Sequence, residues 1–166
     1  MALSPTKKAA VRKAITAYCL KAEANQWHWH YSQQRPFRFV QDPASHNIVA
    51  DCSGYVSMVF HAAMVSTKAY LEDPLGQHYS GWGYTGTEVA WLRAHGREAP
   101  VGKYLVGDLV VYGHSDAGSH TAICRKAGTV STSWWSSNGN EGSPNPVRLQ
   151  YHPDPVRGVW RHPALL

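Results

Sequence analysis

A cysteine and a histidine in this sequence have the placement that nucleophilic attack on a carbonyl requires. Cys52 follows Asp51 at the start of an apolar, helix-like run, and His120 starts a later run that is typical of a strand. The first N–H groups of a helix have no intrahelical partner and carry partial positive charge, so a thiol pKa there is expected to fall. A thiolate beside an imidazole is the reactive pair of cysteine hydrolases and transferases. In the opposing interpretation, Cys52 is a small buried apolar residue.

Hydrophobic periodicity predicts the elements that position these two residues. Ser4 and Pro5 begin an amphipathic pattern that predicts a first helix over residues 5–24. A second helix is expected from Cys52 to about Met64, with Asp51 as its N-cap. A short third helix is expected over residues 87–95.

From Gly107 onward the pattern changes to short strands. These are expected over residues 108–112, 120–124, 129–134, 147–151 and 156–160. Helices followed by antiparallel strands predict one α+β domain over residues 1–166, with N-terminal helices packed on a small sheet. Residues 25–50 are expected to be irregular, and residues 73–86 form a loop rich in glycine and aromatic residues.

Composition and charge indicate which classes of binding partner are expected. Sixteen Lys and Arg against 11 Asp and Glu give a net charge of +5, which favours an anionic partner such as a bacterial wall polymer. The basic residues are scattered, so no nucleic-acid partner is expected. No apolar run approaches the roughly 20 residues of a membrane span, so no membrane insertion is expected. Three cysteines without a CxxC spacing argue against a disulfide framework and a cysteine zinc site.

Three local patterns resemble the NlpC-like peptidoglycan cysteine peptidases. They are Asp51-Cys52-Ser53-Gly54-Tyr55 around the nucleophile, Val106-Gly107-Asp108-Leu109-Val110 before a strand, and Ser119-His120-Thr121-Ala122-Ile123 around the histidine. The resemblance covers about residues 28–161 and is greatest to the peptidase domains of actinobacterial phage lysins. Those domains carry segments similar to His30-Tyr31-Ser32-Gln33 and to Ser137-Asn138-Gly139-Asn140-Glu141. The second pattern departs from the family at Val106, where the family has proline.

The resemblance implies a papain-like fold and a role for each matching residue. Cys52 would attack an amide carbonyl, and His120 would act as general base and then general acid. Asn138 is expected to orient the imidazole, as in Cys-His-Asn triads, with Asn140 and Glu141 as alternatives. Tyr31 is expected to help bind the oxyanion, together with the backbone N–H of Cys52.

Further residues are expected to line a substrate groove. The groove is expected to contain Asp51, Ser53, Ser119, Trp82 and Trp134. Seven Trp and nine Tyr supply aromatic surface on which a sugar or peptide can lie. No cofactor or metal is expected.

The resulting hypothesis is a monomeric, phage-endolysin-like peptidoglycan hydrolase that cuts an amide of the wall peptide. The N-terminus lacks the apolar core of a signal peptide. We therefore expect synthesis in the host cytoplasm and holin-dependent release to the cell wall.

Three alternatives remain open from the sequence. The same fold supports acyltransferases and toxin-like amidases that act on other amides. A non-catalytic wall-binding module would use the aromatic loop over residues 79–84 together with Trp134 and Trp135. A zinc site would use His28 and His30, which face the same side if they lie in a strand, although zinc requires three or four ligands.

Overall fold

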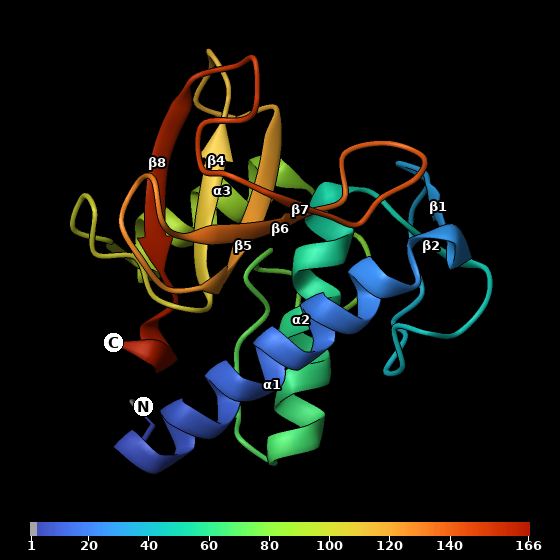
Figure 1. Cartoon of the computed structure of the whole chain (residues 1–166), viewed down its shortest axis with the longest axis horizontal. Coiled ribbons are helices and arrows are strands. Elements are labelled where there is room, and N and C mark those ends of the chain that lie inside the picture. Colours follow the sequence, from blue (N-terminus) through green and yellow to red (C-terminus); the bar gives the residue numbers. More distant parts are fainter. Residues whose placement is uncertain (1–2) are drawn as a thin grey trace.

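The computed structural model describes residues 3–166, in which three α-helices pack on an antiparallel sheet (Figure 1). The helices are α1 (Pro5–Ala24), α2 (Cys52–Thr67) and α3 (Thr85–His95), with short 3₁₀ helices η1 (Gln26–His28) and η2 (Pro163–Leu165). The first helix has the predicted bounds, and the third begins two residues earlier than predicted. Within residues 3–166, no helix combines the length and apolar character that a bilayer crossing requires.

Six strands form the main sheet in the order β3-β8-β4-β5-β6-β7, with all neighbours antiparallel. They are β3 (Arg97–Glu98), β4 (Asp108–Tyr112), β5 (His120–Lys126), β6 (Trp134–Ser137), β7 (Asn145–Val147) and β8 (Val156–Arg161). A separate parallel pair joins β1 (Trp29–Tyr31) to β2 (Ile48–Ala50). The α+β architecture predicted from the sequence is confirmed.

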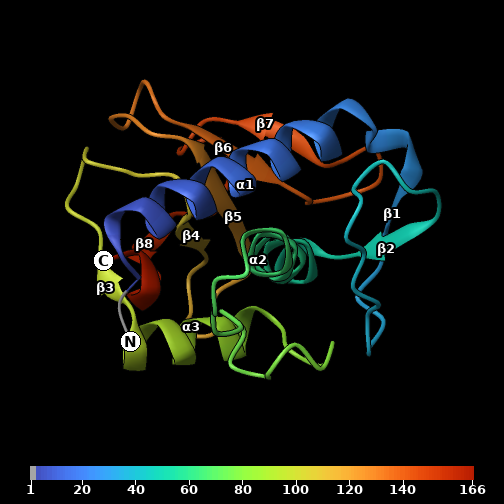
Figure 2. The ribbon, with the colours of Figure 1, turned by 90° about the horizontal axis from the view of Figure 1, so that it is seen from below.

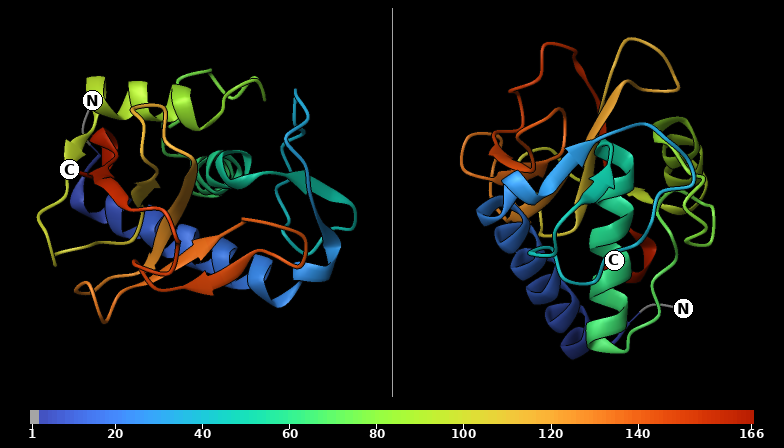
Figure 3. Two further views of the ribbon diagram at one scale, coloured as in Figure 1. Left: turned by 90° about the horizontal axis from the view of Figure 1, so that it is seen from above. Right: turned by 90° about the vertical axis from the view of Figure 1, so that its right-hand side faces the viewer.

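Helix α2 occupies the centre of the fold. Figure 2 looks along α2 and shows α1, β5 and α3 around it. The left panel of Figure 3, seen from the opposite side, shows β2 leading directly into the first turn of α2. Because neighbours cover α2 on several sides, nearly every residue of its first three turns is buried.

The side chain of Asp51 fixes where α2 begins. Its Oδ1 accepts the backbone N–H of Gly54 at 2.8 Å, which confirms the predicted N-cap. The helix ends at Lys68, which has the left-handed backbone conformation of a C-terminal cap (φ 52°). The N-terminal cap at Asp51 therefore sets Cys52 as the first residue of the helix.

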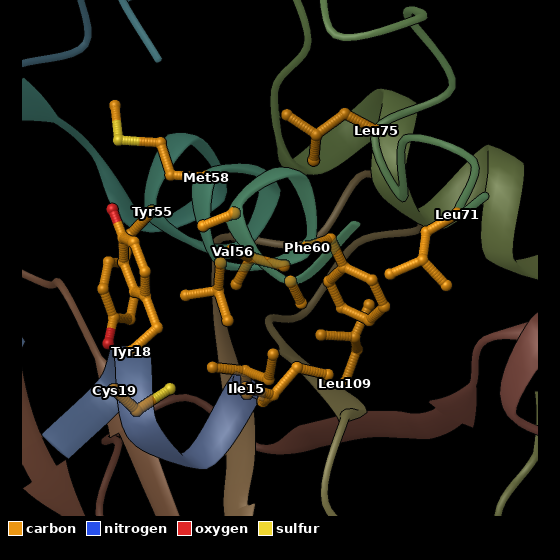
Figure 4. Packing of buried hydrophobic residues seen from close by; sticks show 14 of the residues in the cluster. Ile15, Tyr18, Cys19, Tyr55, Val56, Met58, Phe60, Leu71, Leu75 and Leu109 are labelled. Carbon is orange, nitrogen blue, oxygen red and sulfur yellow. The ribbon is translucent and has the colours of Figure 1, made fainter. Parts of the chain in front are cut away.

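Strand β4 and most of β5, at the centre of the main sheet, are buried on both faces. Alternate residues of β4 and β5 pack against the helices, and the intervening residues pack under the connecting loops. The helix side of this core includes Ile15, Tyr18 and Cys19 of α1 opposite Tyr55, Val56 and Phe60 of α2 (Figure 4). Burial on both faces gives β5 a rigid position beside α2.

Two predicted strands lie elsewhere in the structure. Residues 129–134 were expected to be extended, but Thr129 and Ser133 are joined by a turn, and β6 begins only at Trp134. Hydroxyl hydrogen bonds stabilise this turn, because Thr129 O accepts from the Ser133 hydroxyl at 2.7 Å. The strand expected over residues 147–151 is β7, which ends at Val147. The pair β1–β2 lies in the segment that was expected to be irregular.

Candidate active site

Three elements meet at the thiol of Cys52. The residue is 4% exposed at the start of α2. The backbone N–H of Thr121 in β5 donates a hydrogen bond to it. From the start of α3, the hydroxyl of Thr85 lies 3.7 Å from Cys52 Sγ. Since Thr121 follows His120 in the chain, this contact brings the thiol to the peptide unit that carries the histidine.

The imidazole of His120 is held from two directions. Its Nε2 lies 2.8 Å from the hydroxyl of Ser137 and 2.6 Å from that of Tyr151. Its ring stacks nearly parallel on His152, with centroids 4.8 Å apart. Among residues 3–166, the hydrogen bonds of this ring involve Nε2 alone, so Nδ1 is the nitrogen left for the thiol.

Strand register brings Ser137 to the histidine. In the β5–β6 pair Ile123 lies opposite Ser136, so Ser137, the last residue of β6, lies towards the His120 end of β5. A Cβ built on Gly139 would lie 3.3 Å from Cε1 of His120. The chain after β6 therefore passes close against the ring, and glycine permits this close approach.

Burial keeps both reactive groups neutral. Burial and the Asp51 carboxylate raise the pKa of the Cys52 thiol to about 12, although the Thr121 and Thr85 hydrogen bonds lower it. Burial and the neighbouring His152 lower the pKa of His120 to about 4. The helix start alone predicted a lower thiol pKa. The direction is opposite because the thiol is almost completely desolvated and faces a carboxylate.

A buried ion pair supports the loop before Cys52. An Arg35 guanidinium nitrogen lies 2.8 Å from Oδ2 of Asp51, and both side chains are nearly inaccessible. The hydroxyl of Ser53 donates to Asp51 Oδ1 at 3.1 Å and accepts from Arg35 at 3.3 Å. Asp51 and Ser53, predicted to bind substrate, thus belong to a network that shapes the first turn of α2.

Asn138 braces the chain beside Cys52. Its Nδ2 donates to the carbonyl oxygens of Ala50 and Asp51 at 3.0 and 3.3 Å. Within residues 3–166, its buried Oδ1 has no hydrogen-bond partner. The position next to His120 Nε2, predicted from the sequence for Asn138, is occupied by Ser137 and Tyr151. Asn138 instead ties the segment after β6 to the residues that precede Cys52.

The other candidates for the third residue have different partners. Asn140 binds Ser143 through its backbone N–H and both of its oxygens. Glu141 accepts the backbone N–H of Tyr31 at 2.7 Å. This contact joins the segment after β6 to the end of β1. Burial raises the pKa of Tyr31, and the nearby Cys52 thiol raises it further.

The remaining predicted site residues are spread over the sheet and loops. Ser119 donates to Asp154 Oδ2 at 2.6 Å, immediately before His120. Trp82 is 58% exposed in the loop that leads to α3 and Thr85. Trp134 lies opposite Lys126 at the far end of β5, and Arg148 covers its ring at 3.6 Å from the centroid. Ser119 thus lies directly before His120 and Trp82 lies three residues before Thr85, whereas Trp134 lies apart from the thiol–imidazole pair.

The histidines of the zinc alternative have other contacts. His28 Nδ1 lies 2.7 Å from the carbonyl oxygen of Ala44, and the His28 ring contacts that of His46 at a tilt, with centroids 3.8 Å apart. His30 Nδ1 lies 3.9 Å from Glu141 Oε2. In the described part of the chain, no three His, Cys, Asp or Glu side chains are grouped to hold a metal.

Ser137, Tyr151 and Thr85 were not predicted from the sequence. A strand placed over residues 134–137 would have put Ser137 beside His120, so the error in strand register hid it. Tyr151 reaches the site from a turn after β7, and Thr85 reaches it from the first turn of α3. Periodicity in the sequence does not place either residue at the site.

Comparison with known proteins agrees with this architecture. No protein-family model matches the sequence, and no curated protein matches it. Among solved structures, the chain is similar to the peptidoglycan hydrolase RipB from Mycobacterium tuberculosis, with a TM-score of 0.57 and 16% identity. The match covers 96% of this chain and 68% of that chain. At this identity the likeness concerns the fold, and this chain has the NlpC-like fold that the motifs around Cys52 and His120 predicted.

Proposed function

We propose that this protein is a peptidoglycan hydrolase that cleaves an amide bond of the wall peptide with Cys52 as nucleophile. The observation that carries the proposal is the meeting of Cys52 and the His120–Thr121 peptide, with Ser137 and Tyr151 bound to the far nitrogen of the imidazole. The hydrolase RipB, which shares the fold, supports peptidoglycan as the substrate.

Catalysis begins from a neutral pair. The Nδ1 lone pair of His120 accepts the thiol proton as Cys52 Sγ attacks the carbonyl carbon. This requires hydrogen on Nε2, where the hydroxyl oxygens of Ser137 and Tyr151 accept it. The imidazolium then protonates the leaving amine, which gives a thioester on Cys52. Water, deprotonated by His120, hydrolyses the thioester and restores the thiol.

We propose two donors that stabilise the oxyanion. The backbone N–H of Cys52 belongs to the first turn of α2, where the N–H groups have no partner within the helix and carry partial positive charge. Burial and the nearby thiol raise the pKa of Tyr31, so its hydroxyl stays protonated and able to donate. We propose Tyr31 as the second donor.

Surface groups near the site suit the wall polymer. Trp82 and Tyr84 are 58% and 57% exposed in the segment that ends at Thr85. Flat aromatic faces of this kind bind sugar rings and peptide planes. The net charge of +5 favours approach to an anionic wall.

The test of the substrate is digestion of purified peptidoglycan from actinobacterial and other bacteria, with the products read by mass spectrometry. We expect soluble fragments whose masses identify one amide as the cleaved bond. Transfer of an acyl group to an added amine without wall hydrolysis would contradict the proposal and favour the acyltransferase alternative.

We also propose that the protein acts in phage-type lysis, because its motif details resemble those of phage lysins. Expression in the cytoplasm of a susceptible host is expected to leave cells intact until the membrane is permeabilised, for example by a co-expressed holin. Lysis that proceeds equally without permeabilisation would contradict this role.

A further inference from the structure

Glu88 in α3 is a buried carboxyl group that the mechanism above does not use. The residue is 0% exposed. Its Oε1 lies 3.0 Å from the hydroxyl of Thr121, and within residues 3–166 its buried Oε2 has no hydrogen-bond partner. Thr121 is the residue whose backbone N–H donates to Cys52. Thr121 therefore lies between Glu88 and the Cys52 thiol and contacts both.

The hydrogen bonds of Thr121 indicate whether the Glu88 carboxyl is protonated. Thr121 Oγ1 lies 3.0 Å from the carbonyl oxygen of Val110 and 3.0 Å from Glu88 Oε1. The hydroxyl has one hydrogen, and a carbonyl oxygen is only an acceptor. When that hydrogen goes to Val110, the hydrogen in the second contact has to come from Glu88. Both contacts are then satisfied only if the carboxyl is protonated.

The groups around Glu88 also favour the protonated carboxyl. Asp51 and Asp73 are the charged groups that face it, and Cys52 is the nearby thiol. Asp51 is paired with Arg35, and Asp73 accepts hydrogen bonds from Ser57 and from backbone N–H groups. Burial and these two carboxylates raise the pKa of Glu88 to about 8, although the Thr121 hydrogen bond lowers it.

We propose that Glu88 is a positioning residue, whose protonated carboxyl donates to Thr121 and thereby holds the start of β5 against the Cys52 thiol. Ionisation of Glu88 at alkaline pH removes this donor and places a negative charge close to Sγ. Both changes oppose formation of the thiolate. Glu88 thus limits the reactivity of Cys52 on the alkaline side. The inference rests on Cys52 being the nucleophile proposed above.

The test is the rate at which iodoacetamide alkylates Cys52 between pH 6 and 10, read from the mass of the Cys52 peptide. This reading needs no peptidoglycan, so its failure is distinguishable from a wrong substrate. Glu88→Gln keeps a donor to Thr121 but cannot ionise. We expect it to match the wild type near pH 6.5 and to react about threefold faster or more at pH 9. Glu98→Gln, at an exposed site in β3, is the matched control and is expected to follow the wild type.

A second set of variants separates positioning from packing. Thr121→Ser keeps the hydroxyl and is expected to retain the wild-type profile. In a Thr121→Val background, the further change Glu88→Gln is expected to have a smaller effect on the rate at pH 9, because the hydroxyl that links the carboxyl to β5 is gone and only the charge of Glu88 near Sγ remains. Melting temperatures show whether each variant is folded. Identical pH profiles for the wild type and folded Glu88→Gln would overturn the proposal, as would a Thr121→Val background in which Glu88→Gln accelerates alkylation as much as it does with Thr121 present.

Discussion

The hydroxyl of Tyr151 lies 2.6 Å from Nε2 of His120, and the hydroxyl of Ser137 lies within hydrogen-bond distance of both groups. One nitrogen thus faces two oxygens, each of which is able to accept its single hydrogen. The orienting role that a carboxylate or amide has in other thiol enzymes is shared here by two hydroxyl groups. Because either oxygen suffices, the two residues are partly redundant.

This redundancy predicts non-additive effects of mutation. Tyr151→Phe and Ser137→Ala, made singly, are each expected to lower kcat/KM by no more than about tenfold, the value of one hydrogen bond. The double variant leaves Nε2 without an acceptor and is expected to lose about 10³-fold. Steady-state assays on soluble wall fragments measure this. A double variant whose loss equals the product of two small effects would contradict the shared role.

The charge of Asp51 is predicted to restrain the thiol. Burial raises the pKa of Cys52 most, and the Asp51 carboxylate is the next largest cause. The Asp51 side chain also caps α2. Asp51→Asn keeps a capping oxygen and removes the charge, so the Cys52 pKa is expected to fall and alkylation at pH 8 to become faster. Asp42→Asn, at an exposed turn, is a control of equal charge change. A slower reaction in folded Asp51→Asn would contradict this electrostatic role.

Arg35 is predicted to matter for stability more than surface cations do. Its loss leaves the Asp51 carboxylate buried and unpaired, so Arg35→Ala is expected to lower the free energy of unfolding by about 3 kcal/mol or more. Lys21 forms a comparable 2.8 Å pair with Asp42, but both side chains are more than half exposed. Lys21→Ala is expected to cost less than about 1 kcal/mol. Urea denaturation compares the two variants, and equal losses would contradict the buried-pair interpretation.

Acid is predicted to destabilise the fold through two buried histidines. Burial lowers the pKa of both His120 and His162 to about 4 from an unfolded value of 6.5. The unfolded chain therefore binds more protons between these values. Stability is complete above pH 6.5 and is lost as the pH falls towards 4, by up to about 3 kcal/mol for each residue.

His162 provides the variant that checks this. Its ring accepts the N–H of Ala164 and contacts the carbonyl oxygen of Glu72 at 3.0 Å, which fits the neutral form. His162→Gln is expected to show about half the wild-type loss of unfolding free energy between pH 6.5 and 4. An unchanged pH dependence in the folded variant would show that His162 is not one of the two groups.

Much of this fold was predictable because its signals are local. The cap at Asp51, the apolar run that follows it and the uninterrupted apolar strand β4 each depend on neighbouring residues. These features predicted the α+β class and the positions of Cys52 and His120. The turn at Thr129–Ser133 was not predictable in the same way, because alternating residues there satisfy their hydrogen bonds through hydroxyl groups instead of a strand partner.

The third residue of the site was harder to predict because it depends on long-range register. Ser137 lies beside His120 only through the β5–β6 pairing, and Tyr151 arrives from a turn that follows β7. The thiol pKa likewise depends on burial by α3 and β5, which a helix start in the sequence does not show. Local patterns thus identified Cys52 and His120 as the candidate pair, and tertiary packing determined the partners and the electrostatics of these two residues.

The most direct measurement is the rate of fragment release from peptidoglycan by Cys52→Ala, compared with the wild type and with Cys124→Ala. Cys124 is a buried thiol in β5 and serves as the matched control. Cys52→Ala is expected to lose at least about 10⁴-fold in rate while keeping its melting temperature, and Cys124→Ala is expected to stay within about tenfold of the wild type. A folded Cys52→Ala variant that releases the same fragments within about tenfold of the wild-type rate would contradict a thiol nucleophile at this position.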